Sequence, residues 1–203
     1  MTTSRYLALE LAGTIRHDGN GGVADDLTSV SGLASWVEAH EELLAAEGFA
    51  AGFLADEATW TGVLAVRAGL RALLARAVSP APPSRADADR LPPADQALSR
   101  LNTAAAHCPV VPRLHWPADA APVARLHPAP ADSPADLPAA LARAAIAFLS
   151  GPDLPRLRAC TAPRCVRYFL KEHGRQEFCK TSCSNRARAA RHYQRHHAAP
   201  VAG

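Results

Sequence analysis

Four cysteines fall within 24 residues near the C-terminal end of the chain, in the pattern C-x4-C-x13-C-x3-C. Two close pairs of thiolates, separated by about a dozen residues, form the ligand arrangement of a tetrahedral zinc site. We therefore expect one structural Zn²⁺ per chain, because four thiolates leave no open coordination position for water or substrate. The predicted ligands are Cys160, Cys165, Cys179 and Cys183.

The cysteines could instead form two disulfides or remain four free thiols. Disulfides would fit an exported protein, but Met1 to Glu10 lacks the apolar run of a signal peptide and the fifth cysteine, Cys108, would stay unpaired. A reactive dithiol would be expected as C-x-x-C, which is absent. No stretch approaches the roughly 18 uncharged apolar residues of a membrane span. We expect a soluble cytoplasmic protein that does not contact membranes, with Cys108 as a small apolar residue.

The distribution of charge divides the chain of 203 residues into two parts. Residues 1–155 hold 11 basic and 17 acidic residues, a net charge of −6, whereas residues 156–203 hold 11 basic and 2 acidic residues, a net charge of +9. Four thiolates and one Zn²⁺ would lower the charge of the second part to +7. Such asymmetry indicates a segment that binds a polyanion, or two parts that attract each other.

The fold class predicted from the pattern of apolar residues is mainly α. The first segment, residues 4–15, fits a helix and also the alternation of a strand; we favour the helix. A small hairpin is expected between 110 and 130, where the helical period breaks. The other predicted helices run from a cap at Ser29 or Ser31 to Leu44, over 56–78, from Pro93 through Leu98 and Leu101 to Ala105, and over 136–150.

The C-terminal part is predicted to be a treble-clef-like zinc finger, built from a hairpin and a helix. We place the hairpin over Val166 to Phe178, with its turn at residues 172–174. The helix is expected over Asn185 to His196, with Thr181 or Ser182 as its cap.

These residues carry a resemblance to a known family. Cys183-Ser184-Asn185-Arg186 resembles the motif of the CGNR zinc finger, with Ser184 in place of the glycine. The segments Leu7 to Thr14, Asp26-Leu27 and Leu33 to Val37 resemble the opening of the ABATE domain that precedes this finger, although Gly13 stands where that family usually has Asn. The resemblance implies an ABATE-like domain over 1–152, a finger over 156–198 and a role in stress-induced transcription. We expect residues 199–203 to form a disordered tail.

A helical wheel separates the arginines of the last helix. Arg188, Arg191 and Arg195 form one cationic stripe, whereas Ala187, Ala190 and Tyr193 lie on the opposite side, which we expect to pack on the hairpin. Arg186 lies on this packing side, so we assign Asn185 and Arg186 to holding the finger together through backbone carbonyls or thiolates. The stripe is the predicted nucleic-acid contact, and Arg167 and Lys171, with Arg164, offer a second one on the hairpin.

The sequence thus predicts a DNA-binding transcription regulator with an N-terminal sensing or dimerisation domain. The alternative is a protein-interaction module whose basic finger docks on an acidic partner or on its own N-terminal domain. A homodimer and a small-molecule effector are compatible with either function. We do not expect an enzyme, because the cluster of His17, Asp18, Asp25 and Asp26 lacks a nucleophile and an oxyanion site, and its carboxylates suit helix caps and loops.

Overall fold

The computed structural model describes residues 6–20, 22–49, 53–87, 91–129 and 136–197. It is mainly α, as predicted: helices make up the body of the molecule and each of the three small sheets has two antiparallel strands. The tail predicted over 199–203 lies outside the described residues. The elements are α1 (Leu7–Ala12), β1 (Ile15–His17), β2 (Val23–Asp25), α2 (Val30–Glu38), α3 (Glu41–Ala46), α4 (Glu57–Val78), α5 (Ala94–His107), β3 (Val110–His115), β4 (Val123–Pro128), α6 (Leu137–Leu149), β5 (Leu157–Ala159), β6 (Tyr168–Leu170) and α7 (Thr181–His197), with short 3₁₀ helices over Arg85–Asp87 and Leu154–Arg156.

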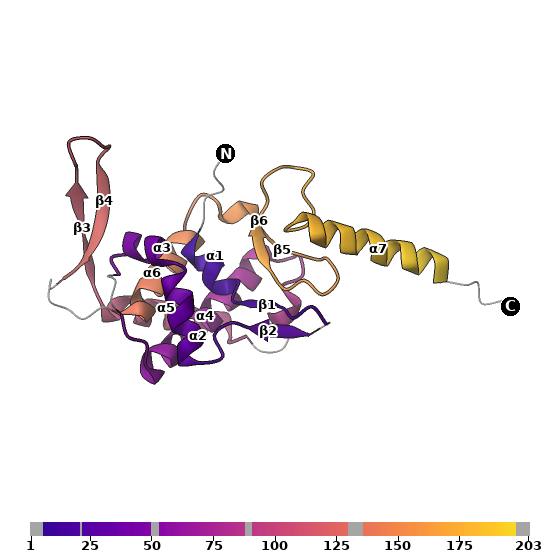
Figure 1. The fold of residues 1–203 in the computed structure, drawn as a ribbon, viewed down its shortest axis with the longest axis horizontal. Coiled ribbons are helices and arrows are strands. Elements are labelled where there is room, and N and C mark those ends of the chain that lie inside the picture. Colours follow the sequence, from indigo (N-terminus) through magenta and orange to yellow (C-terminus); the bar gives the residue numbers. More distant parts are fainter. Residues whose placement is uncertain (1–5, 21, 50–52, 88–90, 130–135, 198–203) are drawn as a thin grey trace.

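Helix α4 is the centre of the body, where it packs against α1, α5 and α6 (Figure 1). It begins where its period and cap predict, because the Asp56 carboxylate accepts a hydrogen bond from the N–H of Thr59 at 2.7 Å. Helix α6 begins in the same way, with the Ala139 N–H donating to Asp136 at 2.8 Å. Both predicted helices are confirmed, and their apolar residues meet in one continuous core.

The helix predicted from Pro93 through Leu98 and Leu101 to Ala105 is present as α5, but Leu98 is not part of its buried face. This residue is 45% exposed, whereas Ala97 and Leu101 are buried. Gly69 of α4 lies close to the Ala97 carbonyl and the Leu101 side chain, so the two helices approach closely along the stripe that contains these two residues. Leu98, one residue further around the helix, is turned toward solvent.

The first segment contains both secondary structures that its pattern allowed. A helix over 4–15 was predicted, but the helix α1 covers only Leu7–Ala12 and a strand, β1, follows it. Strand β1 pairs with β2, Ile15 opposite Asp25, around a turn that the Asp18 carboxylate holds by accepting the N–H groups of Asn20 and Gly22. The residues after Ala12 therefore gain their backbone partners from a hairpin instead of from a longer helix.

The helix predicted to reach Leu44 from its cap is two helices. Ser29 is the cap, because its hydroxyl accepts the Gly32 N–H at 3.2 Å. The break comes at His40, whose Nδ1 bonds the Trp36 carbonyl at 2.7 Å while its ring stacks on the indole of Trp36 at 4.4 Å. At the Trp36 carbonyl, the His40 side chain takes the place of the backbone N–H that would bond it in a continuous helix. Helix α3 begins one residue later.

The small hairpin predicted between 110 and 130 is confirmed as β3 and β4. It stands away from the helices as a two-stranded arm (Figure 1). Leu114 and Trp116, near its tip, are 72% and 69% exposed.

The finger contains a hairpin and a helix, as predicted, but the hairpin has a different first strand. Strand β6 pairs with β5, which precedes the first cysteine pair, so Leu157 lies opposite Leu170. The turn predicted at 172–174 and the strand predicted to return from it to Phe178 lie in a loop over residues 171–180. The hairpin therefore encloses Cys160 and Cys165, and its turn is the segment that carries them.

Helix α7 starts earlier than predicted and projects away from the body (Figure 1). Thr181, a proposed cap, is its first residue, and the Lys180 carbonyl accepts the N–H groups of Cys183 and Ser184. Cys183 is thus placed in the first helical turn. Among the described residues, no helix combines the length and apolar character that a membrane span requires.

Candidate metal centre and nucleic-acid interface

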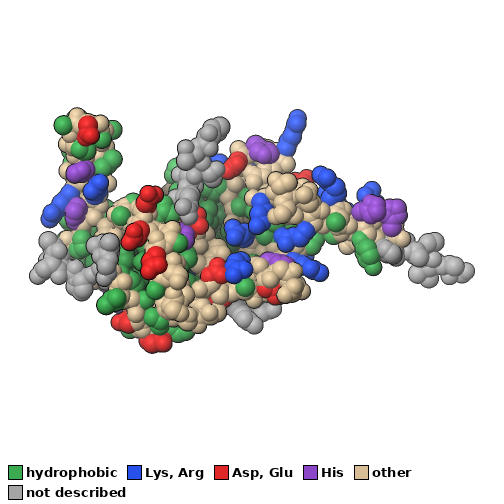
Figure 2. All heavy atoms as spheres, viewed as in Figure 1, with side chains coloured by type: hydrophobic (Ala, Val, Ile, Leu, Met, Phe, Trp, Pro, Cys, Tyr) green, Lys and Arg blue, Asp and Glu red, His purple; other side chains and the backbone are tan. Residues whose placement is uncertain are grey.

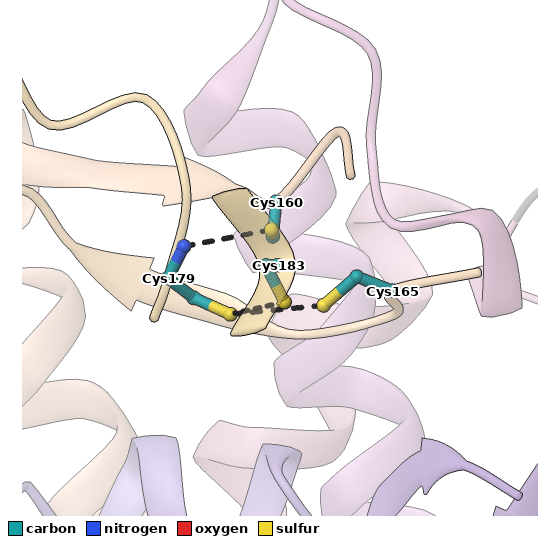
Figure 3. Close-up of side chains that lie close together, drawn as sticks. All are labelled: Cys160, Cys165, Cys179 and Cys183. Atoms are coloured by element: carbon teal, nitrogen blue, oxygen red, sulfur yellow. Dashed lines mark hydrogen bonds between the residues drawn. The ribbon is translucent and has the colours of Figure 1, made fainter. Parts of the chain in front are cut away.

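Each cysteine of the predicted zinc site reaches the centre from a different piece of structure. Cys160 follows β5, Cys165 closes the short turn after it, Cys179 ends the loop before α7, and Cys183 lies in α7 (Figure 3). The turn is tightened by a hydrogen bond from the Cys165 N–H to the Ala162 carbonyl and by a left-handed residue, Arg164, with φ of 66°. The short hairpin and the helix start therefore converge on one point.

The distances between the sulfur atoms fit one zinc ion. All four Sγ atoms lie within 4.8 Å of one another, with 3.7 Å between Cys165 and Cys179 and 3.5 Å between Cys179 and Cys183. A tetrahedron with Zn–S bonds of about 2.3 Å requires sulfurs roughly 3.8 Å apart. None of the five cysteines is in a disulfide, and Cys108 is buried in the body as expected. The four cysteines are positioned to bind one Zn²⁺.

The electrostatics of the cluster favour a cation at its centre. Hydrogen bonds from Cys165 and Cys179 lower the pKa of Cys160 to about 3, so one thiolate forms readily. The pKa of Cys179 is raised because its thiol is hydrogen-bonded to Cys160 and Cys165, because it is partly buried, and because negative charge on those two sulfurs disfavours a third thiolate beside them. A divalent cation removes that opposition, which lets all four sulfurs ionise together.

Hydrogen bonds also reach the sulfurs from the surrounding protein. The Cys179 N–H donates to the Sγ of Cys160 at 3.5 Å, and a guanidinium nitrogen of Arg186 donates to the Sγ of Cys183 at 3.1 Å. Arg186 therefore lies where the helical wheel placed it, against a thiolate. Asn185 is exposed, and its side chain makes no hydrogen bond to the residues that the structure describes.

Comparison with known families agrees with this geometry over most of the chain. Residues 6–152 match the ABATE family, described as "Putative stress-induced transcription regulator". The chain belongs to the ABATE family. Residues 156–196 match the CGNR zinc finger, which contains the four cysteines. Neither is a family of enzymes, and no curated protein matches the chain.

The arginines predicted to contact nucleic acid lie on the surface of the CGNR finger. Arg188, Arg191 and Arg195 are all exposed on α7, and Arg167 is exposed on the hairpin, whereas Lys171 is half-buried. On the face shown in Figure 2, Lys and Arg side chains gather over the finger and Asp and Glu side chains lie mainly over the ABATE domain.

The predicted packing side of α7 extends over only its first turns. Ala187 is buried, but Tyr193 is 64% exposed, so its assignment to the packing side is wrong. The reason is that α7 projects beyond the hairpin, which ends before it can cover the second half of the helix (Figure 1).

The polar cluster near the first loop has structural roles. Asp18 holds the β1–β2 turn, and Asp26 forms an ion pair with Arg16 at 2.7 Å. Asp25 caps the N–H of Leu27 and pairs with Arg67 through both oxygens, at 2.6 and 2.7 Å. Burial alone would raise the pKa of Asp25, but the hydrogen bonds from Arg67 and Leu27 bring it below its ordinary value.

The junction between the finger and the ABATE domain is a buried polar network that the sequence did not reveal. The Tyr168 hydroxyl donates to Asp87 at 2.7 Å, and Asp87 also forms a salt bridge with Arg71 at 2.7 Å, where both side chains are almost fully buried. Ser84 donates to the carbonyl of Val166 at 2.8 Å. Burial raises the pKa of the Tyr168 hydroxyl, and the Asp87 carboxylate raises it further. The finger is thus anchored one residue after its ligand Cys165.

Arg186 and Arg188 provide a matched pair of substitutions on α7. Arg186→Ala should lower the stability of the finger by about 1.5 to 3 kcal/mol, because it removes a charged hydrogen bond to a thiolate. Arg188→Ala should change it by less than about 0.5 kcal/mol, because Arg188 is exposed. Thermal unfolding of the two zinc-loaded variants measures the difference, and equal shifts would contradict the assigned role of Arg186.

Proposed function

We propose that the chain is a DNA-binding transcription regulator whose CGNR finger contacts the phosphate backbone through α7. The observation that carries the proposal is the one-sided stripe of exposed arginines, Arg188, Arg191 and Arg195, on a helix that projects from the body (Figure 1). Guanidinium groups at this spacing can each pair with a phosphate, and arginine can also read guanine in the major groove.

The local charge supports a polyanion as the partner. Helix α7 contains no Asp or Glu, so no acidic neighbour one turn away neutralises its arginines. Metal binding leaves the C-terminal part at +7, because the four thiolates and Zn²⁺ contribute −2 to its formal +9. Arg167 adds an exposed cation from the hairpin and is our second proposed contact, together with Lys171.

A cavity in the ABATE domain supports a sensing role for that domain. It has a volume of about 590 Å³, with Leu64 and Leu91 among its apolar walls and Arg71 and Asp87 among its polar ones. Asp87 accepts the hydroxyl of Tyr168, so a small effector in this cavity would contact the same side chains that anchor the finger. The β3–β4 arm, with exposed Leu114 and Trp116, is the surface that we propose for a homodimer.

The alternative function, docking on an acidic protein, differs from DNA binding in which polyanion the finger binds more tightly. Duplex DNA carries one charge per roughly 1.7 Å, about twice the density of an extended poly-glutamate chain. The zinc-loaded full chain should therefore bind random-sequence duplex at least about tenfold more tightly than poly-glutamate at equal ionic strength. Equal or tighter binding of poly-glutamate, measured by fluorescence anisotropy, would favour an acidic protein partner over DNA.

A further inference from the structure

A cavity of about 310 Å³ lies where the β1–β2 turn of the ABATE domain meets the zinc finger. We call it the seam pocket, and its lining comes from both parts of the chain. The ABATE domain contributes the segment from Arg16 to Gly19, and the finger contributes residues 165–167, Lys180 and Arg186. Pockets between two structural units are common positions for ligands.

Two residues that line the seam pocket have buried nitrogen atoms without a hydrogen-bond partner among the described residues. These atoms are Nε2 of His17 and Nε of Arg186. The Gly19 N–H donates to Nδ1 of His17 at 2.6 Å, which places the proton of a neutral ring on Nε2. Both unpartnered atoms are therefore donors. A buried donor without an acceptor costs free energy, so an acceptor that reached either nitrogen would stabilise the folded chain.

The charges around the pocket favour an acceptor that is an anion. Arg167 and Lys180 are exposed lining residues that form no ion pair within the described part of the chain. Arg16 is already paired with Asp26, and one nitrogen of Arg186 serves Cys183. Asp18 and the −2 charge of a zinc-loaded centre offset part of this positive charge, but one Asp18 oxygen is occupied by two backbone N–H groups. The lining residues left without an ion pair, Arg167 and Lys180, are both cations.

We propose that the seam pocket binds a phosphate group. A phosphate presents several acceptor oxygens at once, so one group can satisfy the imidazole N–H, the guanidinium N–H and the ammonium of Lys180. The volume exceeds that of a single water several-fold and leaves room for a small substituent on the phosphate. The phosphate belongs either to a soluble small molecule or to the backbone of bound DNA, and the recognition chemistry is the same.

Inorganic phosphate titrated into the zinc-loaded full chain tests this site. Phosphate should raise the midpoint of thermal unfolding above that in chloride of equal ionic strength, because a ligand of the folded state stabilises it. Lys180→Ala and His17→Ala should weaken phosphate binding about tenfold or more, since each removes a donor. Lys180 is exposed, so its substitution leaves the fold intact even if His17→Ala does not.

Two residues of the distant β3–β4 arm give matched controls. Arg113→Ala and His115→Ala remove a cation and an imidazole from exposed positions and should leave phosphate binding within about twofold of the wild type. The proposal would be overturned if phosphate stabilised the pocket variants, the control variants and the wild type equally. It would also be overturned if phosphate gave no specific stabilisation and Lys180→Ala left the salt dependence of DNA binding unchanged.

The same variant separates the two sources of phosphate. If the pocket holds a DNA phosphate, Lys180→Ala should reduce the log–log salt slope of DNA binding by about one unit. If the ligand is a soluble phosphate, the slope should not change while phosphate binding is lost. The phosphate titration uses no DNA, so stabilisation by phosphate that is lost in Lys180→Ala would support the site even if the chain bound no DNA.

Discussion

Removal of zinc is expected to unfold the finger and to destabilise the ABATE domain with it. The four cysteines converge only in the folded finger, so the free energy of zinc binding, about 10 kcal/mol or more for structural sites, is also free energy of folding. That amount is comparable to the whole stability of a typical domain. Leu157 and Tyr168 of the finger belong to the main core, so their release should also weaken the body.

Chelator titration followed by circular dichroism measures this effect. Loss of the 17-residue helix α7 should accompany loss of the metal, and the thermal midpoint of the remaining structure should fall. Cys179→Ser should reproduce the result, whereas Cys108→Ala should keep one zinc per chain, because Cys108 lies in the body. Protein purified without chelator that contains no zinc, or an α7 signal that survives chelation, would contradict the assignment.

Replacing Arg188, Arg191 and Arg195 together by alanine is expected to remove most of the affinity for DNA. Each phosphate contact contributes about 0.9 to the log–log salt slope, so three lost contacts should flatten it by nearly three units. Near 0.1 M salt the same loss corresponds to roughly several hundredfold weaker binding. The three residues are exposed and alanine favours helix, so zinc content and helicity should not change.

A variant with the same change in charge elsewhere controls for the net field. Arg76, Arg113 and Arg125 are exposed residues of the body and the arm, and their triple replacement should change the slope by less than one unit. If the α7 variant keeps its slope, the DNA contact lies elsewhere, and Arg167 and Lys171 on the hairpin become the surface to test. Binding that falls equally in both triple variants would show a nonspecific dependence on net charge.

The parts of the fold that could be predicted are those specified by local sequence. Helices α4 and α6 have long 3.6-residue periods and an aspartate cap at Asp56 or Asp136, so both signals agree. The zinc ligands follow from cysteine spacing alone, because a tetrahedral site takes two close pairs of ligands and the four cysteines of the finger have that spacing. The orientation of Arg186 also followed from the helical wheel.

The parts that could not be predicted depend on contacts between distant residues. Strands β1, β5 and β6 have three residues each, too few for a period, so the partner of β6 is decided by the cysteine turn and not by its own pattern. Tyr168 and Asp87 are 81 positions apart, and Arg71 is buried in a helix where periodicity would place an apolar residue. The one sequence feature that could have indicated this junction is Arg71 itself, an arginine within the apolar period of the helix predicted over 56–78.

The dependence of DNA binding on salt tests the central claim most directly. Binding of zinc-loaded full-length protein to random-sequence duplex should be measured from low to moderate salt. Three or four phosphate contacts predict a log–log slope of about −3 to −4. A slope near zero, or no binding at low salt, would contradict the claim that the arginine stripe of α7 lies against a phosphate backbone.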